Sequence, residues 1–223
     1  AIDLSDLGLD TIEEVPGGYR IGAMVTLRQL EQHEGLNRMT EGAARESVRH
    51  IVGVQFRNLA TVGGSIFGRY GFSDVLTLFM AVGASVELYQ GGTVSIEEFV
   101  SMPYDRDILT HVFVPIEKMK AVYLSQRNTK TDFPVLTCCA VKTETGLRIA
   151  IGARPMPAVC FHDEKGLLAS GIHEESAKAM GEYVKENLVT GSNLRGSSEY
   201  RSLLSSVLVR RSLLQIAEME KEG

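Results

Sequence analysis

Two adjacent glycines flanked by hydroxyl side chains form the part of the sequence best suited to binding a phosphate. The segment reads TVGGS and consists of Thr61, Val62, Gly63, Gly64 and Ser65. Because glycine has no Cβ, its backbone N–H can approach a phosphate closely, and the neighbouring hydroxyl groups add donors. The segment could therefore hold a pyrophosphate. It also fits a Gly-Gly turn between a strand and a helix, since paired glycines are common in turns.

An acidic residue lies shortly after this segment, at the predicted start of a helix. Ser73 can cap that helix, and Asp74 occupies its first turn, where a negative charge is favourable. The Asp74 carboxylate could instead accept hydrogen bonds from ligand hydroxyl groups, as acidic residues do in dinucleotide sites. The residues match neither a GxGxxG fingerprint nor a P-loop, so both interpretations stay open.

The other reactive residue types show no spacing that predicts catalysis or metal binding. The five histidines lie far apart, without an HxxxH or HExxH pattern, and no pairing of a nucleophile with a base is recognisable. Cys138 and Cys139 are adjacent and Cys160 stands alone, which predicts neither a disulfide framework nor a CxxC metal site. We expect reduced, buried cysteines, no catalytic residue and no metal in this chain, so any iron–sulfur cluster belongs to a partner.

The composition is that of an ordinary globular chain and excludes several classes of partner. Of the 223 residues, 44% are hydrophobic and 23% are charged, which is enough for one substantial core or two smaller ones. The formal net charge is -5 and the basic residues are scattered, so we expect no nucleic-acid partner. No apolar run is long enough to cross a bilayer, and the first residues lack the features of a signal peptide, which predicts a cytoplasmic protein without membrane contact.

The pattern of elements predicts an α+β protein of two domains, at residues 1–116 and 117–223. In the first, capping-box spacing places helix starts after Thr26 and after Ser95, and a helical stretch covers residues 36–52. Strands are expected in the β-rich opening and at residues 85–89, 93–95 and 108–114. The second domain should contain a small three-stranded antiparallel sheet, at residues 121–125, 135–142 and 147–151, with helices at 174–188 and 198–219 on one face.

Several motifs, in the same order along the chain, resemble those of the FAD-binding subunit of molybdenum hydroxylases. They are IDLS at residues 2–5, IGAMVTL at 21–27, the stretch 57–74, IAIGARPMP at 149–157 and the closing segments 195–201 and 207–211. The family includes xanthine dehydrogenases, aerobic carbon monoxide dehydrogenases and enzymes that oxidise aldehydes or nicotinate. The resemblance implies the second subdomain of a vanillyl-alcohol-oxidase-type FAD-binding domain at residues 1–116, followed by a flavoprotein C-terminal domain at 117–223.

The resemblance also implies roles for individual residues. The TVGGS segment would hold the FAD pyrophosphate, and Asp74 would bind another polar part of the cofactor. Ile51 falls at an apolar flavin contact, and the backbone of Leu109 at the pyrimidine edge of the isoalloxazine. Tyr123 takes a flavin-side position that is lysine in xanthine dehydrogenases, so its type departs from the pattern.

The function that the resemblance implies is electron transfer through bound FAD. A molybdenum cofactor on one partner subunit would oxidise a purine-like or other heterocyclic substrate, and 2Fe-2S clusters on an iron–sulfur subunit would pass the electrons to FAD. NAD+ or another acceptor would then receive them. Two rivals stay open: a free-standing flavin oxidoreductase, and a degenerate non-flavin subunit that serves assembly alone.

The sequence departs from the family at its beginning. Relatives carry a first flavin subdomain, with another phosphate loop of the Gly-Gly-Thr type, before the IDLS strand, and these 223 residues contain none of it. The cofactor would then be held from one side only, with several charge-assisted hydrogen bonds fewer. We therefore expect this chain to bind FAD weakly or to lack it.

Overall fold

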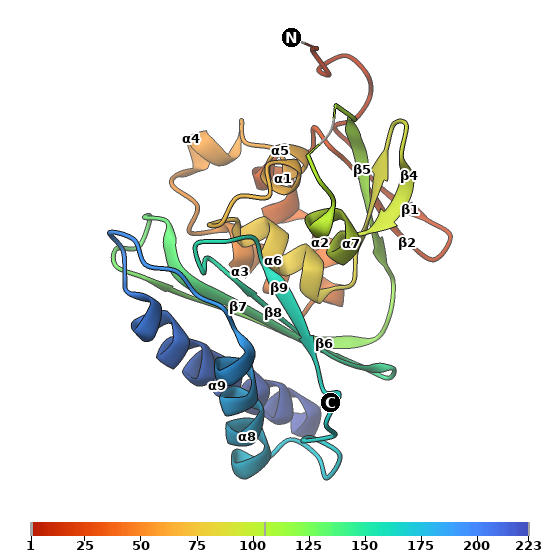
Figure 1. Cartoon of the computed structure of the whole chain (residues 1–223). Helices are drawn as coiled ribbons and strands as arrows, with labels where there is room; N and C mark the ends of the chain where they lie inside the picture. Colours follow the sequence, from red (N-terminus) through yellow and green to blue (C-terminus); the bar gives the residue numbers. More distant parts are fainter. Residues whose placement is uncertain (1, 105, 223) are drawn as a thin grey trace.

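Antiparallel strand pairing builds two sheets, and helices fill the space between and beside them (Figure 1). The structure is a computed structural model that describes residues 2–104 and 106–222. One sheet has five strands in the order β1-β2-β5-β3-β4, and the other has four in the order β6-β7-β8-β9. Antiparallel sheets with separate helices agree with the α+β class predicted from the sequence.

The five-stranded sheet is formed by chain segments that precede residue 116. β1 (Ile12–Val15) and β2 (Gly18–Gly22) make a hairpin around Gly17, whose φ of +85° is rarely adopted by residues with a Cβ. β5 pairs with both β2 and β3, so the last of these strands in the sequence lies at the centre of the sheet. The remaining strands are β3 (Ser85–Leu88), β4 (Gly92–Ser95) and β5 (Leu109–Pro115).

Short helices connect these strands, and side chains cap several of them. The Thr26 hydroxyl accepts the N–H of Gln29 and the Gln29 side chain accepts that of Thr26, which confirms the predicted capping box. The helix expected at residues 36–52 is replaced by two shorter ones, because Gly42 interrupts it with a φ of +84°. The helices are α1 (Leu27–Gln32), α2 (Glu34–Met39), α3 (Ala43–Val48), α4 (Val54–Arg57), α5 (Val62–Phe67) and α7 (Ile96–Ser101).

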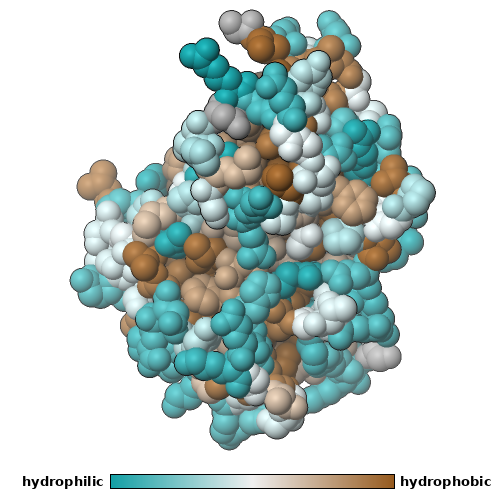
Figure 2. Space-filling view, turned by 45° about the vertical axis from the view of Figure 1, so that its right-hand side comes forward, coloured by the Kyte–Doolittle hydropathy of each residue, from teal (hydrophilic) through white to brown (hydrophobic). Residues whose placement is uncertain are grey.

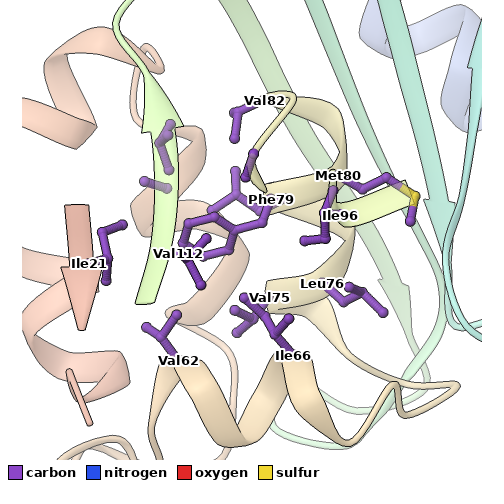
Figure 3. Packing of buried hydrophobic residues seen from close by; sticks show 14 of the residues in the cluster. Ile21, Val62, Ile66, Val75, Leu76, Phe79, Met80, Val82, Ile96 and Val112 are labelled. Carbon is purple, nitrogen blue, oxygen red and sulfur yellow. The ribbon is translucent and has the colours of Figure 1, made fainter. Parts of the chain in front are cut away.

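Helix α6 (Asp74–Ala81) lies between the two sheets, and all of its residues are buried. In Figure 3 the Phe79 ring lies beside Val112 of β5, and Val75 lies next to Ile66 of α5. On its other side α6 contacts β7 and β8 of the second sheet. One apolar core therefore extends from the five-stranded sheet through α6 to the four-stranded sheet.

The second sheet has one strand more than the sequence analysis predicted. β9 (Val159–His162) pairs with β8 at the edge, so the predicted three-stranded sheet is corrected to four strands. β9 has only four residues and follows a segment with two prolines, so it shows little of the alternation that reveals longer strands. The three predicted strands correspond to β6 (Met119–Arg127), β7 (Pro134–Thr143) and β8 (Gly146–Gly152).

Two helices close the outer face of this sheet, at the bottom of the view in Figure 1. α8 (Glu174–Asn187) and α9 (Ser198–Glu222) pack on each other, and α9 lies against β6 and β7. Because α6 and α3 lie on the opposite face, eight consecutive residues of β7 are buried, as in strands covered on both sides. Within the described ranges, no helix combines the length and apolar character that crossing a bilayer requires.

Arg201 joins α9 to the loop that precedes it and to β7. Its side chain is fully buried. The guanidinium donates to the carbonyl oxygens of Val135, Gly191 and Gly196 and to Oδ1 of Asn193. Since a buried acceptor that loses its donor is costly, this single side chain should hold the loop in place.

Replacing Arg201 by methionine should lower the free energy of unfolding by at least about 3 kcal/mol, because four acceptors lose a charged donor. Arg210→Met is the matched control on the same helix, where Arg210 pairs with Glu174 at the surface and a loss below about 1 kcal/mol is expected. Urea unfolding measures both values. Equal losses in the two variants would contradict the anchoring role of Arg201.

Candidate functional site

A cavity of about 520 Å³ lies beside the N-terminal end of α6. Three separate segments form most of its lining: residues 51–65 around α4 and α5, residues 70–75 at the start of α6, and residues 127–133 between β6 and β7. Its volume is in the range of small-molecule and cofactor sites, and its walls are mainly apolar. Figure 2 shows one face of the molecule, on which hydrophobic residues form small groups between hydrophilic ones.

One wall of the cavity carries backbone strain. Ile51, Val52 and Phe56 form this wall, ahead of and within α4. Val52 has a φ of +47°, and the left-handed region is a genuine outlier for a β-branched residue. Such strain concentrates at functional sites, where the surrounding structure holds it in place.

The predicted TVGGS segment starts α5 at another wall of the cavity. Thr61 is the N-cap of α5, and its hydroxyl accepts the N–H of Gly64 at 3.2 Å. Backbone carbonyl oxygens already accept the N–H groups of Val62, Gly63 and Ser65. The Gly64 N–H is therefore the donor in this segment whose partner is a side chain that can rotate away.

The two glycines of the segment meet different surroundings. A Cβ on Gly63 would lie 2.5 Å from the Cβ of Ala23 and 2.7 Å from its carbonyl oxygen. A Cβ on Gly64 would meet only Oγ1 of Thr61, at 3.1 Å, and Gly64 lines the cavity. Gly63 thus permits close packing inside the protein, whereas Gly64 leaves room for a ligand.

The Asp74 carboxylate lies in the cavity lining although only 4% of the residue is exposed. Its Oδ1 accepts from the Tyr123 hydroxyl at 2.7 Å and from Nη2 of Arg127 at 2.5 Å. Burial raises the pKa of Asp74, and the Arg127 charge and the Tyr123 hydrogen bond oppose that rise. Burial and the Asp74 charge raise the pKa of Tyr123 well above its usual value, so its hydroxyl keeps the proton that it donates. Because both side-chain donors bind Oδ1, a ligand hydroxyl would approach Oδ2.

Arg127 is a cavity residue that the sequence analysis missed. Its side chain is 7% exposed and donates from Nη1 to the carbonyl oxygen of Asp132 at 2.6 Å, in addition to its ion pair with Asp74. Among the described atoms, Nε of Arg127 has no hydrogen-bond partner. A buried donor without a partner in a cavity lining fits a site that a bound ligand completes. No local motif marks Arg127, because its partner is 53 residues away in the sequence.

Aromatic rings that the sequence analysis also missed form the rim of the cavity. Tyr70 stacks on Phe72 at 5.2 Å, and Phe72 meets Phe133 at 4.4 Å, measured between ring centroids. Arg195 lies over the Phe133 ring and pairs with Asp132, which fixes this side of the rim. All three rings are partly exposed and line the cavity, so a flat apolar ligand could pack against them.

Five of the residues predicted for the site line this one cavity. They are Ile51, Thr61, Gly64, Ser65 and Asp74. In the sequence they belong to two motifs and one isolated position, and the structure places them at α5, at the start of α6 and on the strained wall before α4. Their roles toward a cofactor stay predictions.

The other predicted residues lie outside the lining. Val62 and Gly63 are buried behind the wall, where they pack into the apolar core and against Ala23. Tyr123 is buried on β6 and reaches the cavity only through its hydrogen bond to Asp74. Leu109 is buried in β5 and is not part of this lining.

The residues present fit the chemistry of part of an FAD molecule. The Gly64 N–H and the Thr61 hydroxyl suit a phosphate oxygen. Because Gly64 has no Cβ, the space beside these two donors stays open for that oxygen. Asp74 suits ligand hydroxyl groups, and Ile51 and the aromatic rim suit an apolar ring.

Comparison with known proteins agrees with this chemistry. The family model described as the FAD binding domain in molybdopterin dehydrogenase matches residues 1–117. The uncharacterized protein YgfM of Escherichia coli (strain K12) is 30% identical, over 94% of this chain and 77% of that protein. The nicotine 6-hydroxylase medium subunit of Paenarthrobacter nicotinovorans is 26% identical, over 96% of this chain and 81% of that subunit.

Solved structures share the fold. Quinoline 2-oxidoreductase from Pseudomonas putida 86 superposes with a TM-score of 0.81 at 21% identity, over 94% of this chain and 78% of that chain. Reconstituted CO dehydrogenase from Oligotropha carboxidovorans gives a TM-score of 0.82 at 20% identity, over 92% of this chain and 77% of that chain. Since the family model covers more than half of the residues, the chain belongs to the FAD-binding oxidoreductase subunits of the molybdopterin dehydrogenase family, of the xanthine and carbon monoxide dehydrogenase type.

Proposed function

We propose that this chain is the FAD-binding electron-transfer subunit of a xanthine dehydrogenase-like molybdenum hydroxylase. An iron–sulfur subunit would deliver electrons from the molybdenum subunit, and NAD+ or another acceptor would receive them. The observation that carries the proposal is the cavity that joins Thr61, Gly64 and Asp74 in a chain of this family. Two relatives are named as the medium subunit of nicotine 6-hydroxylase and the FAD-binding subunit of xanthine dehydrogenase from Escherichia coli O157:H7, which supports a subunit role for this chain.

The residues of the chain would bind and orient FAD, whose isoalloxazine supplies the redox chemistry when bound. The Gly64 N–H and the Thr61 hydroxyl would donate to a pyrophosphate oxygen, and Asp74 would accept from a cofactor hydroxyl. Tyr123 acts as a positioning residue in this proposal, because it touches Asp74 and not the cavity. Contacts of FAD with Ile51 and with the Leu109 backbone remain part of the proposal.

The phosphate donors on this wall are few. The N–H groups of Val62, Gly63 and Ser65 are already bonded to carbonyl oxygens, and the Ser65 hydroxyl donates to the Thr61 carbonyl oxygen. Each missing charge-assisted hydrogen bond weakens binding by on the order of tenfold or more. We therefore propose that this chain by itself holds FAD weakly.

The division of the chain follows the two sheets. We propose a FAD-binding domain of the vanillyl-alcohol-oxidase type at residues 1–116 and a flavoprotein C-terminal domain at residues 117–223. The change from one sheet to the other between Pro115 and Met119 supports this boundary. The three free cysteines are compatible with a reducing compartment, so we place the complex in the cytoplasm.

Copurification tests the proposed function against its rivals. A tagged chain, expressed together with the iron–sulfur and molybdenum subunits of the organism that encodes it, should copurify with both subunits and with flavin. The purified complex should reduce NAD+ or a dye when given a heterocyclic substrate. A complex that assembles without flavin would identify a subunit used for assembly alone. Substrate oxidation at enzymatic rates by the chain and FAD alone would identify a free-standing flavin oxidoreductase.

Substitution of the two glycines should separate cofactor binding from folding. Gly64→Leu places a side chain in the cavity and should weaken FAD binding by at least about tenfold, with little change in unfolding free energy. Gly63→Ala forces a Cβ against Ala23 and should lower the unfolding free energy by about 1–3 kcal/mol. Flavin fluorescence titration and urea unfolding measure the two effects. If Gly64→Leu lost stability and flavin to the same extent, the segment would be a structural turn.

A further inference from the structure

Three side chains able to bind a divalent cation meet between α7 and the edge strand β9, away from the cavity. The carboxylate of Glu97, the thiol of Cys160 and the imidazole of His162 offer ligand atoms that all lie within 4.8 Å of one another. Within residues 2–104 and 106–222, no other group of three such side chains comes together in this way. The expectation of no metal came from ligand spacing along single segments, whereas Glu97 lies on α7 and the other two side chains lie on the distant strand β9.

The geometry of β9 explains why two of the ligands lie together. Cys160 and His162 are two residues apart on a strand, so their side chains project from the same face of the sheet. Phe161 projects from the opposite face and meets Tyr183 of α8, with 6.4 Å between the ring centroids. Glu97 comes from the first turn of α7 and faces the ligand side of β9.

We propose that Glu97, Cys160 and His162 form a binding site for one zinc ion, with water as the fourth ligand. Zinc accepts sulfur, nitrogen and oxygen together, and its tetrahedral bonds space ligand atoms by about 3.3–3.8 Å. Nε2 of His162 already lies 3.7 Å from Oε1 of Glu97. Both of these side chains are nearly half exposed, so small rotations can bring the set to ideal distances.

The surroundings leave these ligands available. The contact of the Cys160 thiol is weak, with Sγ 3.9 Å from the carbonyl oxygen of its neighbour Phe161. Zinc binds cysteine as the thiolate, so binding would release the thiol proton of Cys160 to the solvent. The guanidinium of Arg148 lies near this thiol, but it pairs with Glu117 and donates to the carbonyl oxygen of Ala81.

Zinc at this place would link the two halves of the chain. Glu97 belongs to the helix that follows β4 of the first sheet, and β9 is the edge strand of the second. Figure 1 shows α7 and β9 on neighbouring layers of the molecule. A ligand that binds only the folded state raises the free energy of unfolding. This gain grows with the ligand concentration relative to the dissociation constant.

Cobalt(II) titration of the full chain tests the site, because Co²⁺ takes the place of Zn²⁺ and absorbs light. After removal of metal with a chelator, one equivalent of Co²⁺ should produce visible bands and a thiolate-to-cobalt charge-transfer band, and one equivalent of Zn²⁺ should remove both. Cys160→Ser should abolish the charge-transfer band. Glu97→Gln should weaken Co²⁺ binding by at least about tenfold and should cancel the rise in Tm that Zn²⁺ gives the unchanged chain.

A second histidine–glutamate pair provides the control. His173 lies 2.9 Å from Glu175 at the surface, without a cysteine beside it. His173→Asn keeps an acceptor at the N-cap of α8 and should leave cobalt binding unchanged. Absence of a charge-transfer band in the unchanged chain, or its survival in Cys160→Ser, would overturn the proposal. Glu97 is a surface residue, so Glu97→Gln reports on binding without disturbing the fold.

Discussion

The arrangement of the site depends on the hydrogen bonds that the buried carboxylate of Asp74 accepts from Tyr123 and Arg127. A carboxylate excluded from water needs charged or hydrogen-bonding partners, since an uncompensated buried charge is strongly destabilising. Both partners, Tyr123 and Arg127, come from β6, whereas Asp74 begins a helix of the preceding half of the chain. This polar contact therefore fixes the position at which α6 docks on the second sheet. The apolar surfaces around it would define that position less sharply.

The same network continues from Asp74 to the rim of the cavity. Arg127 holds the carbonyl oxygen of Asp132, and the Asp132 carboxylate pairs with Arg195, whose guanidinium covers the Phe133 ring. The turn between β6 and β7 is thereby connected to the start of α6 through successive hydrogen bonds. This connection keeps the exposed Phe133 ring in a defined place at the rim of the cavity.

Local signals in the sequence predicted local structure well. The hydroxyls of Thr26 and Ser95 cap the helices that their spacing predicted, and Ser73 caps α6 in the same way. The sequence could not show Arg127 as a partner of Asp74, or β9 as a fourth strand, because both depend on contacts between distant segments. For the TVGGS segment, the sequence left phosphate binding and a structural turn open. The structure packs Gly63 against Ala23 and places Gly64 at the cavity, and phosphate binding by Gly64 stays a prediction.

The cavity belongs to both halves of the chain, although the family model matches residues 1–117 only. Thr61, Gly64 and Asp74 lie within the matched part, whereas Arg127 and Phe133 lie beyond it and complete the opposite wall. A buried core runs across the junction from one sheet to the other, so independent movement of the halves would expose apolar surface. The matched residues alone would lack this opposite wall and would leave the Asp74 carboxylate without Tyr123 and Arg127. The cavity is thus a property of the docked halves, and the second sheet forms part of its wall.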